Sequence, residues 1–260
     1  MSWPVFRLAV RLRVRSTLSA AAALVAVLLI VGALFPAVGD SIGKLHLPKG
    51  VSDLLGGADY ATITGWYRSE IASFYGPLLI AAVAITGAVG ATAGEEEDRI
   101  LALVLAQPVT RARLVAAKAA AVAAAVIAIA LAAWAGLIAG VAVGGGGIGV
   151  RALGAYSFQL AFFGLAIGAV ALALGAGTGR KALAAEVAAG VAIAGWLING
   201  FAPLVAAASW LRYLSPYYYY AHADPLTNGV DLDDLVVLGS LTAALTVVAM
   251  VTIGRRDLRA

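Results

Sequence analysis

Six apolar stretches, each long enough to cross a bilayer, restrict this chain to the membrane class. A helix needs about 20 apolar residues to span the hydrocarbon core. The chain is 62% hydrophobic and only 12% charged, which is also typical of membrane proteins. Backbone groups inside lipid must pair within their own segment, so helices are expected. We predict an all-α polytopic protein, a single transmembrane domain over residues 1–260, with spans at 17–38, 71–93, 114–143, 150–176, 182–208 and 235–253.

The first 15 residues combine a basic stripe with an apolar side. Arg7, Arg11 and Arg15 repeat every four residues, and Trp3 is a typical interfacial anchor. This pattern predicts an N-terminal amphipathic helix on the membrane surface. The alternative is a basic flank that only orients the first span. A basic start and an apolar run also fit a cleaved signal peptide, but the length of the run and the later spans favour a retained helix.

The distribution of basic residues predicts the orientation. Of the 18 Lys and Arg, all but five fall in segments on one side of the predicted spans. Cytoplasmic segments carry the excess of Lys and Arg, so both termini are expected in the cytoplasm, in a bacterial plasma membrane. The net charge of +4 therefore reflects topology and does not indicate nucleic-acid binding. The five exceptions are Lys44, Lys49, Arg68, Arg151 and Arg212.

A polar segment separates the second and third spans. Four acids at 95–98 precede apolar residues that recur at helical spacing within 100–106, and Pro108 and a basic group follow. Acids are favoured at a helix N-terminus, and proline ends a helix. Thr110 is placed to cap the next helix. The pattern predicts a short cytoplasmic helix lying on the membrane, where a soluble partner can act.

The residues that catalysis needs are missing. The chain has no cysteine, which excludes disulfides and thiolate sites. Its two histidines, His46 and His222, each stand alone in a predicted loop, so no metal site is expected. No catalytic or nucleotide-binding motif is present, and the glycines at 144–147 read as an external turn. We predict no enzyme and no cofactor in this chain, so the energy for any transport must come from a partner.

A few polar residues inside or beside the spans remain to be explained. Thr86, Gln159 and Asn199 lie within predicted spans and are the only candidate catalytic groups for an intramembrane enzyme, an alternative that we do not favour. A threonine in a span usually forms a hydrogen bond to its own helix. Glu186 is expected to pair with Arg180 or Lys181 near the membrane surface. The aromatic segment 209–234 predicts an interfacial belt, with a binding surface as the alternative.

The segment from Gly94 to Lys118 resembles the signature of ABC-2 type transporter permeases. The matching features are the Gly-Glu-Glu run, the apolar short helix, the turn Gln107-Pro108-Val109-Thr110-Arg111 and Lys118 at the next helix start. The tail 254–258 and the segment 214–216 resemble the corresponding parts of that family. The resemblance implies a coupling helix after the second span and short re-entrant helices before the sixth. It also implies a second permease subunit, self or sister, and a separate ABC ATPase pair that binds ATP and Mg.

The resemblance also nominates residues. It assigns ATPase coupling to Glu95, Glu96, Glu97, Asp98, Arg99 and Arg111, whereas the alternative is a solvated charge run that orients the spans. It implies that the second and fifth spans line the substrate pathway, so Thr86 and Asn199 are the candidate pathway residues. An apolar pathway suits export of a hydrophobic or amphipathic substrate such as a drug, antibiotic or lipid. The alternative function is a membrane scaffold or regulator that docks a cytoplasmic partner without transport.

Overall fold

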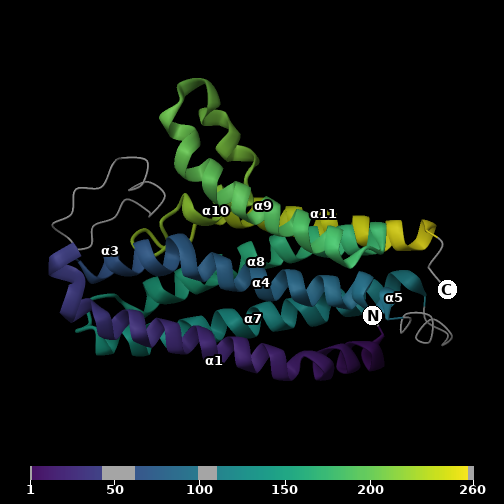
Figure 1. Ribbon diagram of the computed structural model, residues 1–260, viewed down its shortest axis with the longest axis horizontal. Coiled ribbons are helices and arrows are strands. Elements are labelled where there is room, and N and C mark those ends of the chain that lie inside the picture. The colour runs from purple at the N-terminus through teal and green to yellow at the C-terminus, as the bar shows by residue number, and fades with distance from the viewer. Residues whose placement is uncertain (1, 43–61, 99–109, 257–260) are drawn as a thin grey trace.

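Six helices run side by side along the long axis of the described part of the protein, and the start of the first and the end of the last lie at the same end of the bundle (Figure 1). The computed structural model describes residues 2–42, 62–98 and 110–256, with side chains up to residue 37 in the first range. This part contains no strand. The predicted all-α membrane fold is confirmed, and the membrane-spanning helices are Trp3–Ala37, Ile63–Glu97, Arg111–Val143, Val150–Thr178, Lys181–Leu204 and Leu232–Arg255.

The first span begins earlier than predicted. Helix α1 (Trp3–Ile42) is continuous, so the N-terminal stripe forms its first turns and is not a separate surface helix. After Pro4, which lies in its first turn where proline is tolerated, no glycine or proline occurs before Gly32, and Pro36 lies near its far end. Helix α1 packs chiefly against α7 (Arg111–Val143). The two backbones touch at Gly32 and Gly140, because a side chain on Gly32 would overlap the Gly140 carbonyl.

The second span is helical from Ile63, eight residues before the predicted start. Thr62 caps it, since its hydroxyl accepts a hydrogen bond from the Gly65 amide at 3.1 Å. Two π-helical segments flank its central α-helix, a geometry that is rare and concentrated at functional sites. In chain order the pieces are α3 (Ile63–Tyr67), π-helix η1 (Arg68–Tyr75), α4 (Gly76–Val89), π-helix η2 (Gly90–Gly94) and α5 (Glu95–Glu97).

Helix α8 (Val150–Thr178) is the most buried span and packs against α4, α7, α9 (Lys181–Phe201) and α11 (Leu232–Arg255). The turn between α7 and α8 is as tight as predicted. Its three central glycines, 145–147, have φ values of 102°, 78° and 111°. These angles strain any residue with a side chain, so the glycine run is needed to join two antiparallel spans.

The fifth span is shorter than predicted. Helix α9 ends at Phe201, because Pro203 follows directly and removes a backbone donor. Short helices η3 (Ala202–Leu204), η4 (Ala206–Leu214) and α10 (Pro216–Ala221) lead to the last span. Residues 202–214, which we call the arm, project from the bundle as a hairpin, and α10 returns against α8 and α9 (Figure 1). Helix η4 has no buried residue.

Candidate functional site

Glu95 is paired inside the end of the bundle that carries both termini. Its Oε2 atom accepts a hydrogen bond from Lys118 Nζ of α7 at 2.6 Å, and the two side chains are only 15% and 3% exposed. Arg13 of α1 interacts electrostatically with the same carboxylate and lies beside Gly90 of η2. This contact explains why Arg13 departs from the basic stripe. The pairing connects α1, α5 and α7.

Glu96 is also turned inward. It is 3% exposed and forms an ion pair with Arg256 at the end of α11. Arg111, at the start of α7, also contacts the end of α11. Its Nη1 donates hydrogen bonds to the carbonyls of Ile253 at 3.3 Å and Arg256 at 2.8 Å. Helices α5, α7 and α11 are therefore tied together by charged groups.

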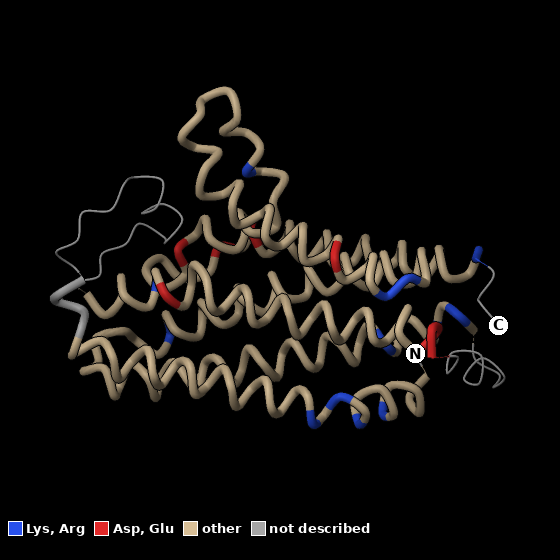
Figure 2. The backbone as a smooth tube through the Cα atoms, viewed as in Figure 1, with Lys and Arg blue, Asp and Glu red and all other residues tan. Residues whose placement is uncertain are grey.

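The last two acids face outward. Glu97 is exposed, and its Oε1 accepts from the Lys181 amide at 2.9 Å, where the dipole of α9 favours negative charge. Asp98 is exposed, and Arg99 with the predicted coupling helix 100–106 lies outside the described residues. Figure 2 shows charge concentrated at this end of the bundle. We call the joined residues the ionic cluster: Arg13, Glu95, Glu96, Glu97, Arg111, Lys118 and Arg256.

The ionic cluster can transmit force between helices. Breaking a buried ion pair is costly, of the order of 3–5 kcal/mol, because one charge stays buried without a partner. A displacement of residues 95–97 must therefore move the ends of α7, α9 and α11 or break these pairs. The sequence identified the acids and Arg111, but it did not show which cations they meet. Two signals were available: Lys118 belongs to the same motif as the acids, and Arg13 lies outside the basic stripe of Arg7, Arg11 and Arg15.

The two nominated pathway residues lie near opposite ends of α4 and α9. Thr86 is exposed, close to the α5 end of α4, and its hydroxyl donates to the Ala82 carbonyl at 2.7 Å. It thus bonds its own helix, as threonines in membrane helices commonly do. Asn199 lies two residues before the other end of α9. The structure does not bring the two into one site.

A cleft of about 60 Å³ separates α4 and α9 at the end away from the ionic cluster. Ser73, Phe74, Trp196 and Tyr217 contribute to its walls, and the Phe74 and Trp196 rings lie 5.6 Å apart. The Trp196 indole N–H is buried and has no acceptor within the described residues. A buried donor without an acceptor is costly, so a ligand whose acceptor reached it would be favoured. Sequence reasoning did not single out Trp196, because an aromatic residue within a predicted span is expected to pack.

Tyrosines hold the π-helix η1 beside this cleft. The Tyr217 hydroxyl donates to the Ser73 carbonyl at 2.8 Å, and the Tyr220 hydroxyl donates to the Ala72 carbonyl at 2.7 Å. Both rings are buried, at 3% and 1% exposure, so the interfacial-belt prediction is wrong for these two residues. Burial raises the pKa of both phenols, which keeps them protonated and able to donate.

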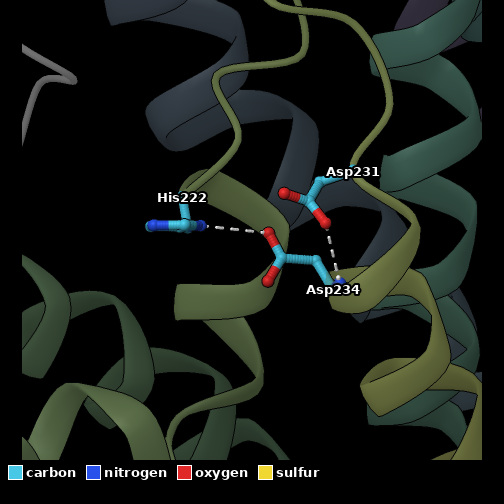
Figure 3. Close-up of side chains that lie close together, drawn as sticks. All are labelled: His222, Asp231 and Asp234. Atoms are coloured by element: carbon cyan, nitrogen blue, oxygen red, sulfur yellow. Dashed lines mark hydrogen bonds and ion pairs between the residues drawn. The ribbon is translucent and has the colours of Figure 1, made fainter.

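His222 is exposed, as expected of a loop histidine, but it does not stand alone. Its Nδ1 lies 3.3 Å from Asp234 Oδ2, and Asp231 caps α11 by accepting from the Asp233 and Asp234 amides (Figure 3). Possible ligand atoms of His222, Asp231 and Asp234 lie within 4.8 Å of one another. Pairing and capping already account for the contacts drawn here, so this geometry alone assigns no metal. His46 lies outside the described residues.

Comparison with known proteins places the chain in a transporter family. The model of the family described as multidrug efflux system permease Rv1217c, C-terminal domain, matches residues 4–253. No curated protein gives a significant match. The family match covers the six membrane-spanning helices almost to their outer ends, every residue of the ionic cluster except Arg256, and the α4–α9 cleft. The chain is therefore a multi-pass membrane permease that belongs to this multidrug efflux family.

Proposed function

We propose that this permease is the membrane-spanning half of an ATP-binding cassette exporter and that a separate ATPase pair drives it. Family membership supports efflux, and the sequence lacks a nucleotide-binding motif of its own. The observation that carries the proposal is the ionic cluster. It joins the ends of four helices, α1, α7, α9 and α11, to residues 95–97, which lead through Asp98 into the predicted coupling helix.

The proposed mechanism is alternating access driven from the cytoplasmic side. ATP binding would move the coupling helix, and the ionic cluster would pass that movement to α7, α9 and α11. The pieces of the second span are continuous in the chain, so α4 joins the ionic cluster to the α4–α9 cleft. Such a shift requires that ATP bind the two states with different affinity.

The exposed side of α9 supports a second permease subunit, either another copy or a sister chain. An exposed stripe runs along this helix: Glu186, Gly190, Ile193, Leu197 and Phe201. Glu186 forms no ion pair with Arg180 or Lys181, contrary to the sequence-based expectation. A carboxylate in a membrane helix usually faces protein or water, not lipid. We propose that this stripe and the arm meet the second subunit and enclose the pathway.

Reversal of the charge on Asp98 is expected to weaken the complex with the ATPase, because this acid is exposed and no described group neutralises it. The measurement is co-purification of the permease with a candidate ABC ATPase, comparing wild type with Asp98→Lys. Asp233→Lys is the matched control, since it makes the same charge change on an exposed acid at the other end of the bundle. We expect the control to bind as wild type does.

Two results would count against parts of this proposal. Equal binding by Asp98→Lys and wild type would show that the ATPase binds the permease at a surface that does not include Asp98. Failure of ABC ATPases to bind wild type, together with no ATPase stimulation in proteoliposomes, would favour the scaffold function instead.

Trp196→Phe is expected to impair transport of substrates that carry a hydrogen-bond acceptor. The change keeps the aromatic ring but removes the unpaired N–H of the cleft. One hydrogen bond is worth about 1 kcal/mol, so KM should rise roughly fivefold. The measurement is efflux from proteoliposomes of two hydrophobic dyes that differ by one carbonyl. Trp3→Phe, at the exposed start of α1 and outside both the cleft and the arm, is the control. An equal effect on both dyes would show that the indole N–H takes no part in substrate recognition.

A further inference from the structure

A second apolar hollow lies on the outside of α7 and α8, away from the α4–α9 cleft. This groove holds about 700 Å³, and its other wall reaches Val230 ahead of α11. Its large apolar side chains are open, with Leu131 57% and Phe158 50% exposed. Exposed apolar side chains are normal on a membrane-spanning helix, so the hollow itself and the charge at its rim are what distinguish this place. None of its lining residues belongs to the ionic cluster or the cleft.

The groove has the length of one membrane leaflet. On α8 its lining extends from Arg151, at the start of the helix, to Leu165, near the middle. Fourteen residues of helix cover about 21 Å. Half of the ~30 Å hydrocarbon core is about 15 Å, and the rest reaches the headgroup region. The apolar part therefore ends near the bilayer centre, where an acyl chain from one leaflet would also end.

Arg151 gives the rim of the groove an unbalanced positive charge. It is exposed and makes no hydrogen bond or ion pair with any described residue. The other two described cations at this end of the bundle are engaged: Arg68 pairs with Asp224, and Arg212 donates to the Tyr213 hydroxyl. Trp134, an interfacial residue type, is fixed at the same rim because its indole donates to the Val150 carbonyl at 3.2 Å.

We propose that this groove binds an anionic phospholipid from the leaflet on the side of the α7–α8 turn. Its phosphate would contact the Arg151 guanidinium, which suits a bidentate contact. One acyl chain would lie between α7 and α8 and end near Leu165. Charge complementarity and length select a lipid over a second copy of the chain. A second copy has the α9 stripe and the arm available instead. The site does not depend on the proposed ATPase coupling.

The test measures lipid retention by the full-length protein. Purified protein is exchanged into nanodiscs that contain equal phosphatidylglycerol and phosphatidylcholine, released into detergent and analysed by native mass spectrometry. Wild type should retain phosphatidylglycerol preferentially. Arg151→Gln should retain roughly fivefold less, as expected for loss of one cation at the surface. Arg212→Gln, which removes a cation that does not line the groove, should leave retention unchanged. Ala155→Phe, which fills the groove, should lower retention of both lipids.

Several outcomes would overturn the inference. Equal retention of the two lipids by wild type would show that charge does not select the occupant. Unchanged phosphatidylglycerol in Arg151→Gln would place the lipid elsewhere. If Ala155→Phe changed the oligomeric state and left lipid retention intact, the groove would be an interface between copies. Thermal unfolding of each variant confirms that it is folded, and Arg151→Gln, which is exposed, keeps the test informative if Ala155→Phe does not fold.

Discussion

Gly140→Val is expected to prevent stable packing of α1 on α7. A Cβ atom at Gly140 would lie 2.5 Å from the Leu28 carbonyl oxygen and would also collide with the Tyr67 hydroxyl. Tyr67 is fully buried and donates to that same carbonyl at 3.2 Å, so neither atom can withdraw easily. Small residues let membrane helices approach this closely. The helices would have to separate, and we expect a loss of more than about 3 kcal/mol in unfolding free energy.

The measurement is unfolding of the purified protein in mixed micelles by titration with denaturing detergent. Gly190→Val is the matched control, because nothing lies within 4 Å of a Cβ atom placed at Gly190 of α9. It should unfold as wild type does in the isolated subunit. If Gly140→Val unfolded at the wild-type detergent fraction, the close contact between α1 and α7 would be wrong.

The six crossings could be predicted because lipid imposes a simple rule on sequence. A helix that crosses the core must be long and apolar, so hydropathy locates the spans almost alone. The ends of the spans depend on single residues instead. Thr62 starts the second span early by capping it, and Pro203 stops the fifth early. The Gly136-xxx-Gly140 spacing is typical of closely packed membrane helices, but only the structure identifies α1 as the neighbour.

The site was harder to predict because it depends on contacts between distant residues. Glu96 and Arg256 are separated by 160 positions, and no local pattern connects them. The run of acids looked uniform, yet the structure turns Glu95 and Glu96 inward and leaves Asp98 exposed. Trp196 was overlooked for a related reason. An aromatic residue in a span normally packs, and its missing acceptor becomes evident only when α4 lies beside it.

The second span connects the two ends of the molecule. At one end, π-helix η1 is held by Tyr217 and Tyr220 next to the α4–α9 cleft. At the other, π-helix η2 leads into Glu95 of the ionic cluster. Both irregular segments lie where α4 meets groups from other helices. Helix α4 therefore links the end that carries the ionic cluster to the cleft, which is the connection that the proposed mechanism requires.

Lys118→Glu is expected to destabilise the fold and abolish transport. It would place a second acid against Glu95 at a site that is 3% exposed, so a buried carboxylate would lose its partner. The expected cost is about 3–5 kcal/mol of unfolding free energy. The measurement is detergent-induced unfolding together with efflux in proteoliposomes. Arg113→Glu makes the same charge change on an exposed residue of α7, and it should leave stability nearly unchanged.

The exchange variant, Glu95→Lys with Lys118→Glu, separates stability from coupling. It restores opposite charges, but the lysine at position 95 would then face Arg13, which interacts with Glu95 in the native protein. We therefore expect stability to recover in part, with a coupling free energy above about 1 kcal/mol. Strictly additive effects would mean that Glu95 and Lys118 do not interact. Stability could recover while transport does not. That result would show that transport needs the charges in their native order, with the acid at position 95 facing Arg13.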